Sequence, residues 1–108
     1  MDEVSVSDAN ILQCFRLDGR VAVVTGGGTG IGRAIAHGLS DVGADVVVAG
    51  RRLGPLEHVA AEIAGRGRRA LAITADVTSE AAMTELAEAA ASFGPLWVWV
   101  NNAGGVAG

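Results

Sequence analysis

Val21-Ala22-Val23-Val24-Thr25-Gly26-Gly27-Gly28-Thr29-Gly30-Ile31-Gly32 is the stretch that decides the fold of this 108-residue chain. Its first part is an apolar run rich in β-branched valine, which is typical of a buried parallel strand. Glycines end the run, and apolar residues then recur at helical spacing from Ile31 to Val42. The order strand, glycine turn, helix directs free backbone N–H groups and the positive end of the helix dipole toward an anion. The stretch therefore predicts a loop that binds the pyrophosphate of a dinucleotide.

The spacing of the glycines distinguishes this loop from two other phosphate-binding loops. Gly26, Gly30 and Gly32 give G-x-x-x-G-x-G instead of the more common G-x-G-x-x-G. The gap from Gly27 to Gly32 fits the phosphate loop of nucleoside triphosphatases, but Arg33-Ala34 follow where that loop requires a lysine and a hydroxyl. The remaining alternative is a tight strand-to-helix turn without a ligand, for which fewer glycines would suffice.

The composition restricts the class of the protein. A chain of 108 residues, half of them apolar, suffices for one domain with a modest core. The formal net charge of −4 argues against nucleic acid or an anionic membrane surface as a partner. Cys14 is the only cysteine, which excludes an intramolecular disulfide, and we expect no metal site. Because there is neither a secretory signal nor an apolar run of about 20 residues that could span a membrane, the expected compartment is the cytoplasm.

Apolar segments of alternating period predict four strands and three helices in one domain. Residues 1–14 are expected to form a polar lead-in, and residues 15–108 a half-size dinucleotide-binding domain. Pro55 is tolerated in the first turn of a helix, and Gly65 comes just past the apolar residues of the second one. The expected strands begin at Val21, Asp45, Ala70 and Leu96. The expected helices run from Gly30 to Val42, from about Pro55 to just before Gly65, and from a cap at Thr78 or Ser79 to just before Gly94.

This alternation predicts an α/β fold with a parallel, doubly wound sheet of strand order 3-2-1-4 and right-handed crossovers. The first two helices are expected on one face of the sheet and the third on the other. In such a sheet the ligand lies at the carboxyl ends of the strands, where the strand order reverses. We therefore expect the glycine loop to lie beside Asn101-Asn102-Ala103-Gly104, which follow the fourth strand.

Three motifs in this order resemble those of the short-chain dehydrogenase/reductase family, whose fold is a Rossmann sheet. They are Thr25-Gly26-x-x-x-Gly30-Ile31-Gly32, Asp76-Val77 after the third strand, and Asn101-Asn102-Ala103-Gly104. The resemblance covers residues 15–105 and corresponds to the amino-terminal half of a typical member. It implies an NAD(P)-dependent oxidoreductase that transfers a hydride between a carbonyl or alcohol and the nicotinamide ring.

The resemblance also implies which residues bind the cofactor. In the glycine loop, the pyrophosphate and the adjacent riboses would be lined by Gly26, Gly28, Thr29, Gly30, Ile31 and Gly32. Asp76 would accept a hydrogen bond from the adenine amino group, beside the backbone of Val77, although an aspartate also serves as a plain turn or helix-entry residue. The ribose on the nicotinamide side would be bordered by Asn102, Ala103 and Gly104, whereas Asn101 is expected to bridge strands.

The end of the second strand predicts NADP(H) rather than NAD(H). NAD-binding members carry an acidic residue there for the ribose 2′-hydroxyl, whereas this chain has Gly50-Arg51-Arg52. A guanidinium group pairs with a 2′-phosphate through charge-assisted, bidentate hydrogen bonds. The alternative is a solvated pair of arginines, and Thr29 stands where many NADP-binding members have a second basic residue.

Polar residues outside these motifs carry weaker expectations. His37 and His58 are expected on helix surfaces without a cluster of partners. The run from Arg66 to Arg69 is expected to form a small solvated basic patch.

The family's catalytic groups are a serine and a Tyr-x-x-x-Lys motif, and this chain has no tyrosine and no lysine. We therefore expect it to bind the cofactor without catalysis, because proton transfer commonly contributes about 10²–10⁴-fold to the rate. The last strand, with Trp97 and Trp99, would be an exposed edge, and the helices that usually form the family's homo-oligomer interface would be missing.

Three interpretations of the chain stay open. It is a truncated piece of a short-chain oxidoreductase, a non-catalytic NADP-binding module that completes its sheet with a partner, or an interaction domain whose glycine loop has no ligand. The residues that select the substrate in the family lie outside the three motifs, so no substrate is predicted.

Overall fold

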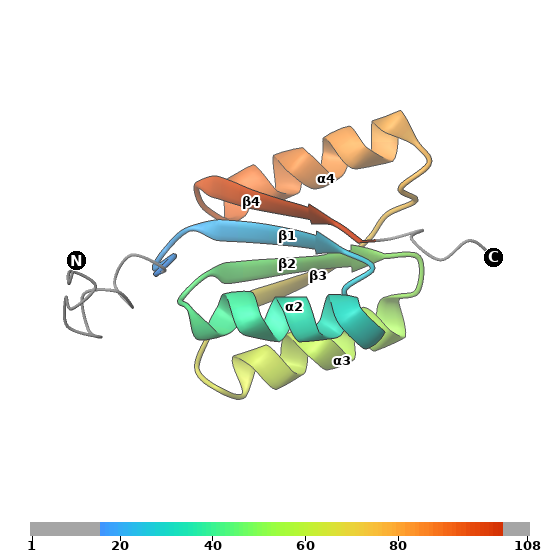
Figure 1. Cartoon of the computed structure of the whole chain (residues 1–108). Coiled ribbons are helices and arrows are strands. Elements are labelled where there is room, and N and C mark those ends of the chain that lie inside the picture. Colours follow the sequence, from blue (N-terminus) through green and yellow to red (C-terminus); the bar gives the residue numbers. More distant parts are fainter. Residues whose placement is uncertain (1–15, 103–108) are drawn as a thin grey trace, which may run out of the picture.

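The computed structural model describes residues 16–102, which form a four-stranded parallel sheet with helices on both faces (Figure 1). The predicted lead-in, residues 1–14, and two predicted site residues, Ala103 and Gly104, lie outside the described residues. The strands are β1 (Val21–Thr25), β2 (Asp45–Gly50), β3 (Ala70–Thr74) and β4 (Leu96–Asn101), and the helices are α2 (Gly30–Asp41), α3 (Leu53–Ala64) and α4 (Glu80–Phe93). The strand order is β3-β2-β1-β4 with every pair parallel, which confirms the predicted doubly wound α/β topology.

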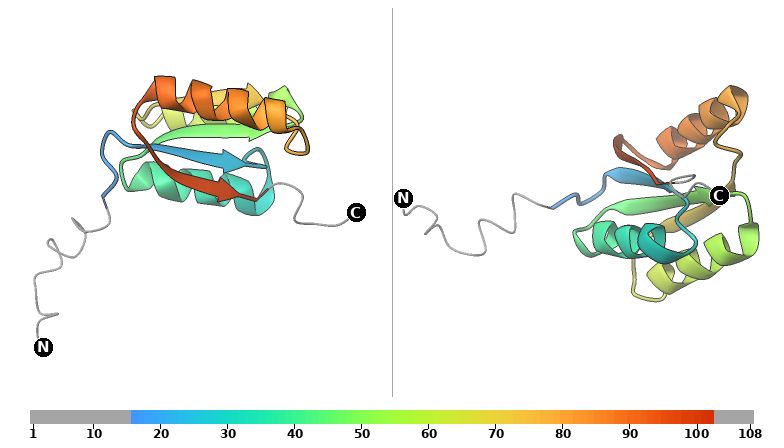
Figure 2. Two further views of the ribbon diagram at one scale, coloured as in Figure 1. Left: turned by 90° about the horizontal axis from the view of Figure 1, so that it is seen from above. Right: turned by 45° about the vertical axis from the view of Figure 1, so that its right-hand side comes forward.

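The two central strands, β1 and β2, are buried on both faces, as their valine-rich sequences predict. Successive side chains point to opposite faces of the sheet. Val24 therefore packs with apolar residues of α2 and α3, whereas its neighbour Val23 packs with Leu86 of α4. Both views of the ribbon agree that α2 and α3 cover one face and α4 the other, as predicted (Figures 1 and 2).

The helix ends follow the signals in the sequence. Ser79, rather than Thr78, caps α4, because its side-chain oxygen accepts a hydrogen bond from the Ala82 N–H group at 3.1 Å. Helix α3 stops directly before Gly65, and α2 stops one residue before the predicted end, with Val42 as its C-cap. Because each helix follows a strand, it begins near the carboxyl edge of the sheet, where the site is expected.

Strand β4 pairs with β1 alone among the described strands, so it forms one edge of the sheet. Val21 pairs with Leu96 and Ala22 with Val98, so Trp97 is an extra residue in a bulge. Trp97 is 60% exposed, and the centroid of its ring lies 4.0 Å from the guanidinium carbon of Arg20. The expectation of exposed tryptophans therefore holds for Trp97, whereas Trp99 is half-buried against the cluster on the α4 side.

Candidate functional site

The turn between β1 and α2 has a backbone that only glycine accommodates at three positions. Gly26 and Gly30 have φ angles of +67° and +58°, in the left-handed region that favours glycine. At Gly32 the backbone angle is ordinary, but a Cβ atom would overlap the Gly26 carbonyl oxygen and lie 2.8 Å from Asn102 Nδ2. The loop therefore returns close to itself and presents a bare backbone surface at the start of α2.

The amino terminus of α2 has no side-chain cap. Thr29 occupies the N-cap position in an extended conformation, but its side chain makes no capping hydrogen bond. The first N–H groups of a helix have no partner within the helix, and together with the helix dipole they favour a bound anion. This end of α2 is thus suited to hold a phosphate group.

Thr25 joins the end of β1 to the end of β4. The Asn102 N–H group donates to Thr25 Oγ1 at 2.9 Å, and the Thr25 hydroxyl lies 3.0 Å from Asn101 Oδ1. Asn102 Nδ2 also donates to the Gly26 carbonyl oxygen at 3.4 Å. These contacts place Asn102 against the glycine loop, as the predicted topology requires, and give Asn101 the expected bridging position.

A first hollow lies between the glycine loop and the start of α3. Its lining residues are Gly26, Gly28, Thr29, Gly50, Arg51, Arg52, Pro55 and Leu56. The loop and the helix approach closely here, because a Cβ atom at Gly28 would lie 3.0 Å from Pro55 Cβ. Arg51 and Arg52, the predicted arginine pair, therefore line the same hollow as the glycine loop.

Arg51 and Arg52 differ from most other arginines of the chain in their partners. Within residues 16–102, neither makes a hydrogen bond or ion pair, and both are exposed. Four other arginines pair with carboxylates, and these are Arg16, Arg33, Arg66 and Arg69. The first hollow therefore holds two guanidinium groups that form no ion pair within residues 16–102, although the Arg51 charge acts on the Asp76 carboxylate.

A second hollow, lined by Arg51, Thr74, Ala75, Asp76 and Ala82, lies at the end of β3. Asp76 Oδ1 accepts hydrogen bonds from the Thr78 hydroxyl at 2.6 Å and the Thr78 N–H group at 2.9 Å. These bonds, and to a smaller extent the Arg51 charge, lower the pKa of Asp76 below its usual value. Asp76 is thus a helix-entry residue through Oδ1. Oδ2 has no partner in the part of the chain that the structure describes, so that oxygen can accept from a ligand.

Some predicted site residues line neither hollow. Ile31 is 72% exposed in the first turn of α2, and Val77 is half-buried beyond Asp76. Conversely, Gly50, Pro55 and Leu56 line the first hollow although none of them was predicted as a site residue. The available signal for Gly50 was its place at the end of a central strand. No feature of the sequence marked Pro55 and Leu56 as site residues, because they line the hollow only once α3 has packed on the sheet.

His58, Arg66 and Arg69 lie on the surface, as expected, but the expectation that the histidines have no partners is wrong. His37 Nε2 and His58 Nε2 lie 2.8 and 3.3 Å from the carboxylate oxygens of Glu62. In the predicted patch, Arg66 pairs with Asp41 and Arg69 pairs with Asp45. Helices α2 and α3 pack side by side and bring together polar residues that are 25 to 29 positions apart in the sequence.

The described residues also bear on metals and membranes. Residues 16–102 contain no group of three or more histidine, cysteine or acidic side chains arranged to hold a metal ion. In the same range, no helix has the length and apolar character needed to cross a membrane.

Comparisons with known proteins agree on one family. The sequence model of a family described as short chain dehydrogenase matches residues 20–108. An uncharacterized oxidoreductase of Mycobacterium tuberculosis is 47% identical over 96 residues, which are 88% of this chain and 36% of that relative. Among solved structures, a hydroxysteroid dehydrogenase from Escherichia coli has a TM-score of 0.79 at 42% identity, over 84% of this chain and 39% of that one. RhlG of Pseudomonas aeruginosa, solved as an NADP active-site complex, has a TM-score of 0.72 at 39% identity, over 82% of this chain and 36% of that one. The chain thus spans little more than a third of the length of the relatives it matches.

Proposed function

The chain belongs to the short-chain dehydrogenase family, and on that premise we propose that it binds the dinucleotide of an oxidoreductase, with NADP(H) preferred over NAD(H). The cofactor of this family supplies or accepts a hydride at its nicotinamide ring. For the whole protein we propose hydride transfer between an alcohol and a carbonyl compound. The share of that activity that we propose for these residues is cofactor binding.

The proposed binding residues follow the two hollows and the glycine loop. The bare backbone of the loop and the uncapped start of α2 suit a pyrophosphate. The residues proposed for it are Gly26, Gly28, Thr29, Gly30, Ile31 and Gly32. Asp76 Oδ2 is proposed to accept from the adenine amino group, beside Val77, and Asn102 to border the second ribose, with Ala103 and Gly104 outside the described residues.

The observation that carries the NADP preference is the unpaired arginine pair in the first hollow. Arg51 and Arg52 lie across this hollow from Gly28 and Thr29, without a carboxylate partner among residues 16–102. Arg51 also lines the second hollow, so it lies between the proposed phosphate and adenine sites. A guanidinium fork suits a phosphate dianion. The Pseudomonas aeruginosa relative was solved as a complex with NADP, which supports NADP as a ligand of this fold.

The test is calorimetric titration of the chain with NADP and with NAD. We expect NADP to bind more tightly, and Arg51→Ala to weaken NADP about tenfold, because a hydrogen bond to a charged group contributes ~1.5–3 kcal/mol. NAD, which lacks the 2′-phosphate, should be affected less than about twofold. Arg68→Ala is the matched control, since Arg68 also forms no ion pair within residues 16–102 but lines neither hollow.

Two results would contradict the proposal. If NADP binds no more tightly than NAD, or if Arg51→Ala leaves the ratio of their dissociation constants unchanged, the preference is wrong. If neither nucleotide binds or raises the melting temperature, the interaction-domain interpretation is favoured instead.

We further propose that these 108 residues do not turn over substrate by themselves. The chain has neither the tyrosine nor the lysine that would position the proton for the family's reaction. The expected result is saturable NADPH binding without NADPH oxidation above background when carbonyl compounds are added. Measurable turnover would contradict this proposal and leave the binding proposal intact.

A further inference from the structure

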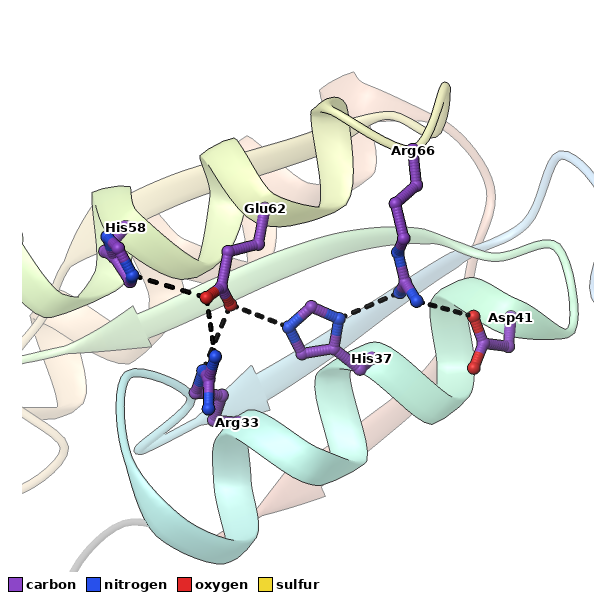
Figure 3. Close-up of polar contacts among 6 residues, drawn as sticks. All are labelled: Arg33, His37, Asp41, His58, Glu62 and Arg66. Atoms are coloured by element: carbon purple, nitrogen blue, oxygen red, sulfur yellow. Dashed lines mark hydrogen bonds and ion pairs between the residues drawn. The ribbon is translucent and has the colours of Figure 1, made fainter.

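A series of polar contacts joins the outer sides of α2 and α3 (Figure 3). Its members are Arg33, His37 and Asp41 on α2, His58 and Glu62 on α3, and Arg66, which follows the C-cap of α3. We refer to these six residues as the interhelix network. None of them lines either hollow, so the network is separate from the candidate site.

Glu62 is the centre of the interhelix network. Arg33 donates to both of its carboxylate oxygens, from Nε at 3.0 Å and from Nη2 at 2.5 Å. His37 Nε2 and His58 Nε2 approach the same carboxylate at 2.8 and 3.3 Å. The bonds from Arg33, and then that from His37, lower the pKa of Glu62 from 4.5 to about 2. The carboxylate is therefore ionised at neutral pH and holds partners from both helices.

The remaining contacts extend the interhelix network along α2. Arg66 contacts His37 Nδ1 at 2.8 Å, and because arginine has only donors, Nδ1 must accept. The neutral ring then carries its hydrogen on Nε2 and donates it to Glu62. Arg66 also pairs with Asp41 at 3.2 Å. The partners thus alternate between the two helices from the first turn of α2 to its last residue, which holds α3 at one offset along α2.

This offset determines the shape of the first hollow. The glycine loop continues directly into α2, and Arg33 follows the last glycine of the motif. On the other side, Arg52 is the N-cap of α3 and Pro55 lies in its first turn. Pro55 and Gly28 line the same hollow, and a Cβ atom at Gly28 would lie 3.0 Å from Pro55 Cβ, so a shift of α3 along α2 would move both arginines relative to the loop.

We propose that Glu62 is a positioning residue for nucleotide selectivity, which holds Arg51 and Arg52 opposite the glycine loop by fixing α3 against α2. This inference rests on the proposed NADP preference. Loss of the Glu62 contacts should weaken the binding of NADP, whose 2′-phosphate needs the arginines in place. NAD has no such phosphate and should be affected much less.

The experiment compares the dissociation constants of NADP and NAD for the wild-type chain and for Glu62→Gln, at a temperature below both melting transitions. We expect the preference for NADP to fall about fivefold in Glu62→Gln. A direct charge effect would act in the opposite direction, because removal of a carboxylate favours the more highly charged nucleotide. Glu85→Gln on α4 is the matched control, since it makes the same change at an exposed residue without an ion pair among the described residues.

A second variant approaches the same contact from α2. Arg33→Gln removes the bidentate partner of Glu62, and the double variant should lose no more than about twofold beyond the larger single effect, because both changes break one interaction. This variant also keeps the test valid if Glu62→Gln fails to fold.

The outcomes separate this inference from the proposed function. If the wild-type chain prefers NADP but Glu62→Gln keeps the wild-type ratio, or if the single effects add in full, the positioning role is wrong and the proposed function stands. If the wild-type chain shows no preference for NADP, the proposed preference fails and this inference fails with it.

Discussion

Gly32 is the residue at which the glycine loop, α2 and the end of β4 approach most closely. A Cβ atom there would overlap the Gly26 carbonyl oxygen, which belongs to the backbone and cannot rotate away. Gly38 lies on the same helix but in open space, with no atom within 4 Å of an added Cβ. Close packing therefore requires a glycine at position 32, whereas position 38 has room for a larger side chain.

Substitution of the two glycines should have opposite effects on stability. We expect Gly32→Ala to lower the free energy of unfolding by about 1–3 kcal/mol, because the turn must open to admit the methyl group. We expect Gly38→Ala to raise it by roughly 0.5–1 kcal/mol, because alanine restricts the unfolded chain and favours the helix. Urea denaturation measures both, and a destabilised Gly38→Ala or a neutral Gly32→Ala would refute this explanation.

The residues that the sequence predicted best are those whose role is local. The glycines of the loop and the cap of α4 are recognisable because the constraint and the residue lie within a few positions of each other. Asp76 had two predicted roles, and the structure assigns the helix-entry role to Oδ1. Pro55 was predicted only as a helix residue, since its contact with Gly28 depends on where α3 packs.

Among the helices and strands, too, the features set by local sequence were predictable and those set by packing were not. Strands β2 and β3 begin at the predicted residues, Asp45 and Ala70, because their apolar runs are bounded by turn residues. No local sequence feature indicated that α2 and α3 pack side by side. Arg33 and Glu62 are 29 positions apart, so their contact follows from the lengths of the intervening elements and was missed.

The contact between α2 and α3 predicts how stability depends on pH. The pKa of Glu62 is about 2 in the folded chain and 4.5 without its partners, so the unfolded chain binds more protons between these values. Its stabilising effect should therefore be complete above pH 4.5 and decline as the pH falls toward 2.

Thermal melts of the wild-type chain and Glu62→Gln between pH 7 and pH 3 test this dependence. The difference in melting temperature should be largest near neutrality and shrink below about pH 4.5, as the Glu62 carboxylate of the unfolded chain becomes protonated while that of the folded chain stays ionised. Glu85→Gln supplies the baseline for a carboxylate without an ion pair in the described range. A difference that stays constant down to pH 3 would show that the Glu62 charge does not stabilise the fold.

At the scale of the whole molecule, the edge of the sheet formed by β4 carries an exposed aromatic residue. Trp97 is 60% exposed on β4, which pairs with β1 alone among the described strands. Unpaired N–H and C=O groups on such an edge favour pairing with another chain. The bulge at Trp97 and the Arg20 guanidinium over its ring are the features that interrupt this edge.

We expect Trp97→Glu to reduce self-association of the 108-residue chain. A charge on an edge strand disfavours pairing with a second edge, and the lost contact with Arg20 should cost only about 0.5–1 kcal/mol. Sedimentation over a wide range of protein concentrations measures the association. Leu53→Glu, which changes another exposed apolar residue away from the sheet edge, is the control and should leave association unchanged.

The overall topology was predictable because alternating strands and helices with right-handed crossovers allow few arrangements. The two hollows were not, since each is formed by residues from three or more segments that meet only in the folded chain. The sequence therefore predicts the edge of the sheet at which the site lies, and the structure adds the shape of that site.

The two tryptophans of β4 are also intrinsic fluorescence probes of folding. There is no tyrosine, so ultraviolet fluorescence comes from these two indole rings. Trp99 is half-buried against the cluster on the α4 side, and Trp97 is exposed beneath Arg20. The emission of a Trp97→Phe variant thus reports the docking of α4 on the sheet. The emission of Trp99→Phe reports the solvent at the open edge.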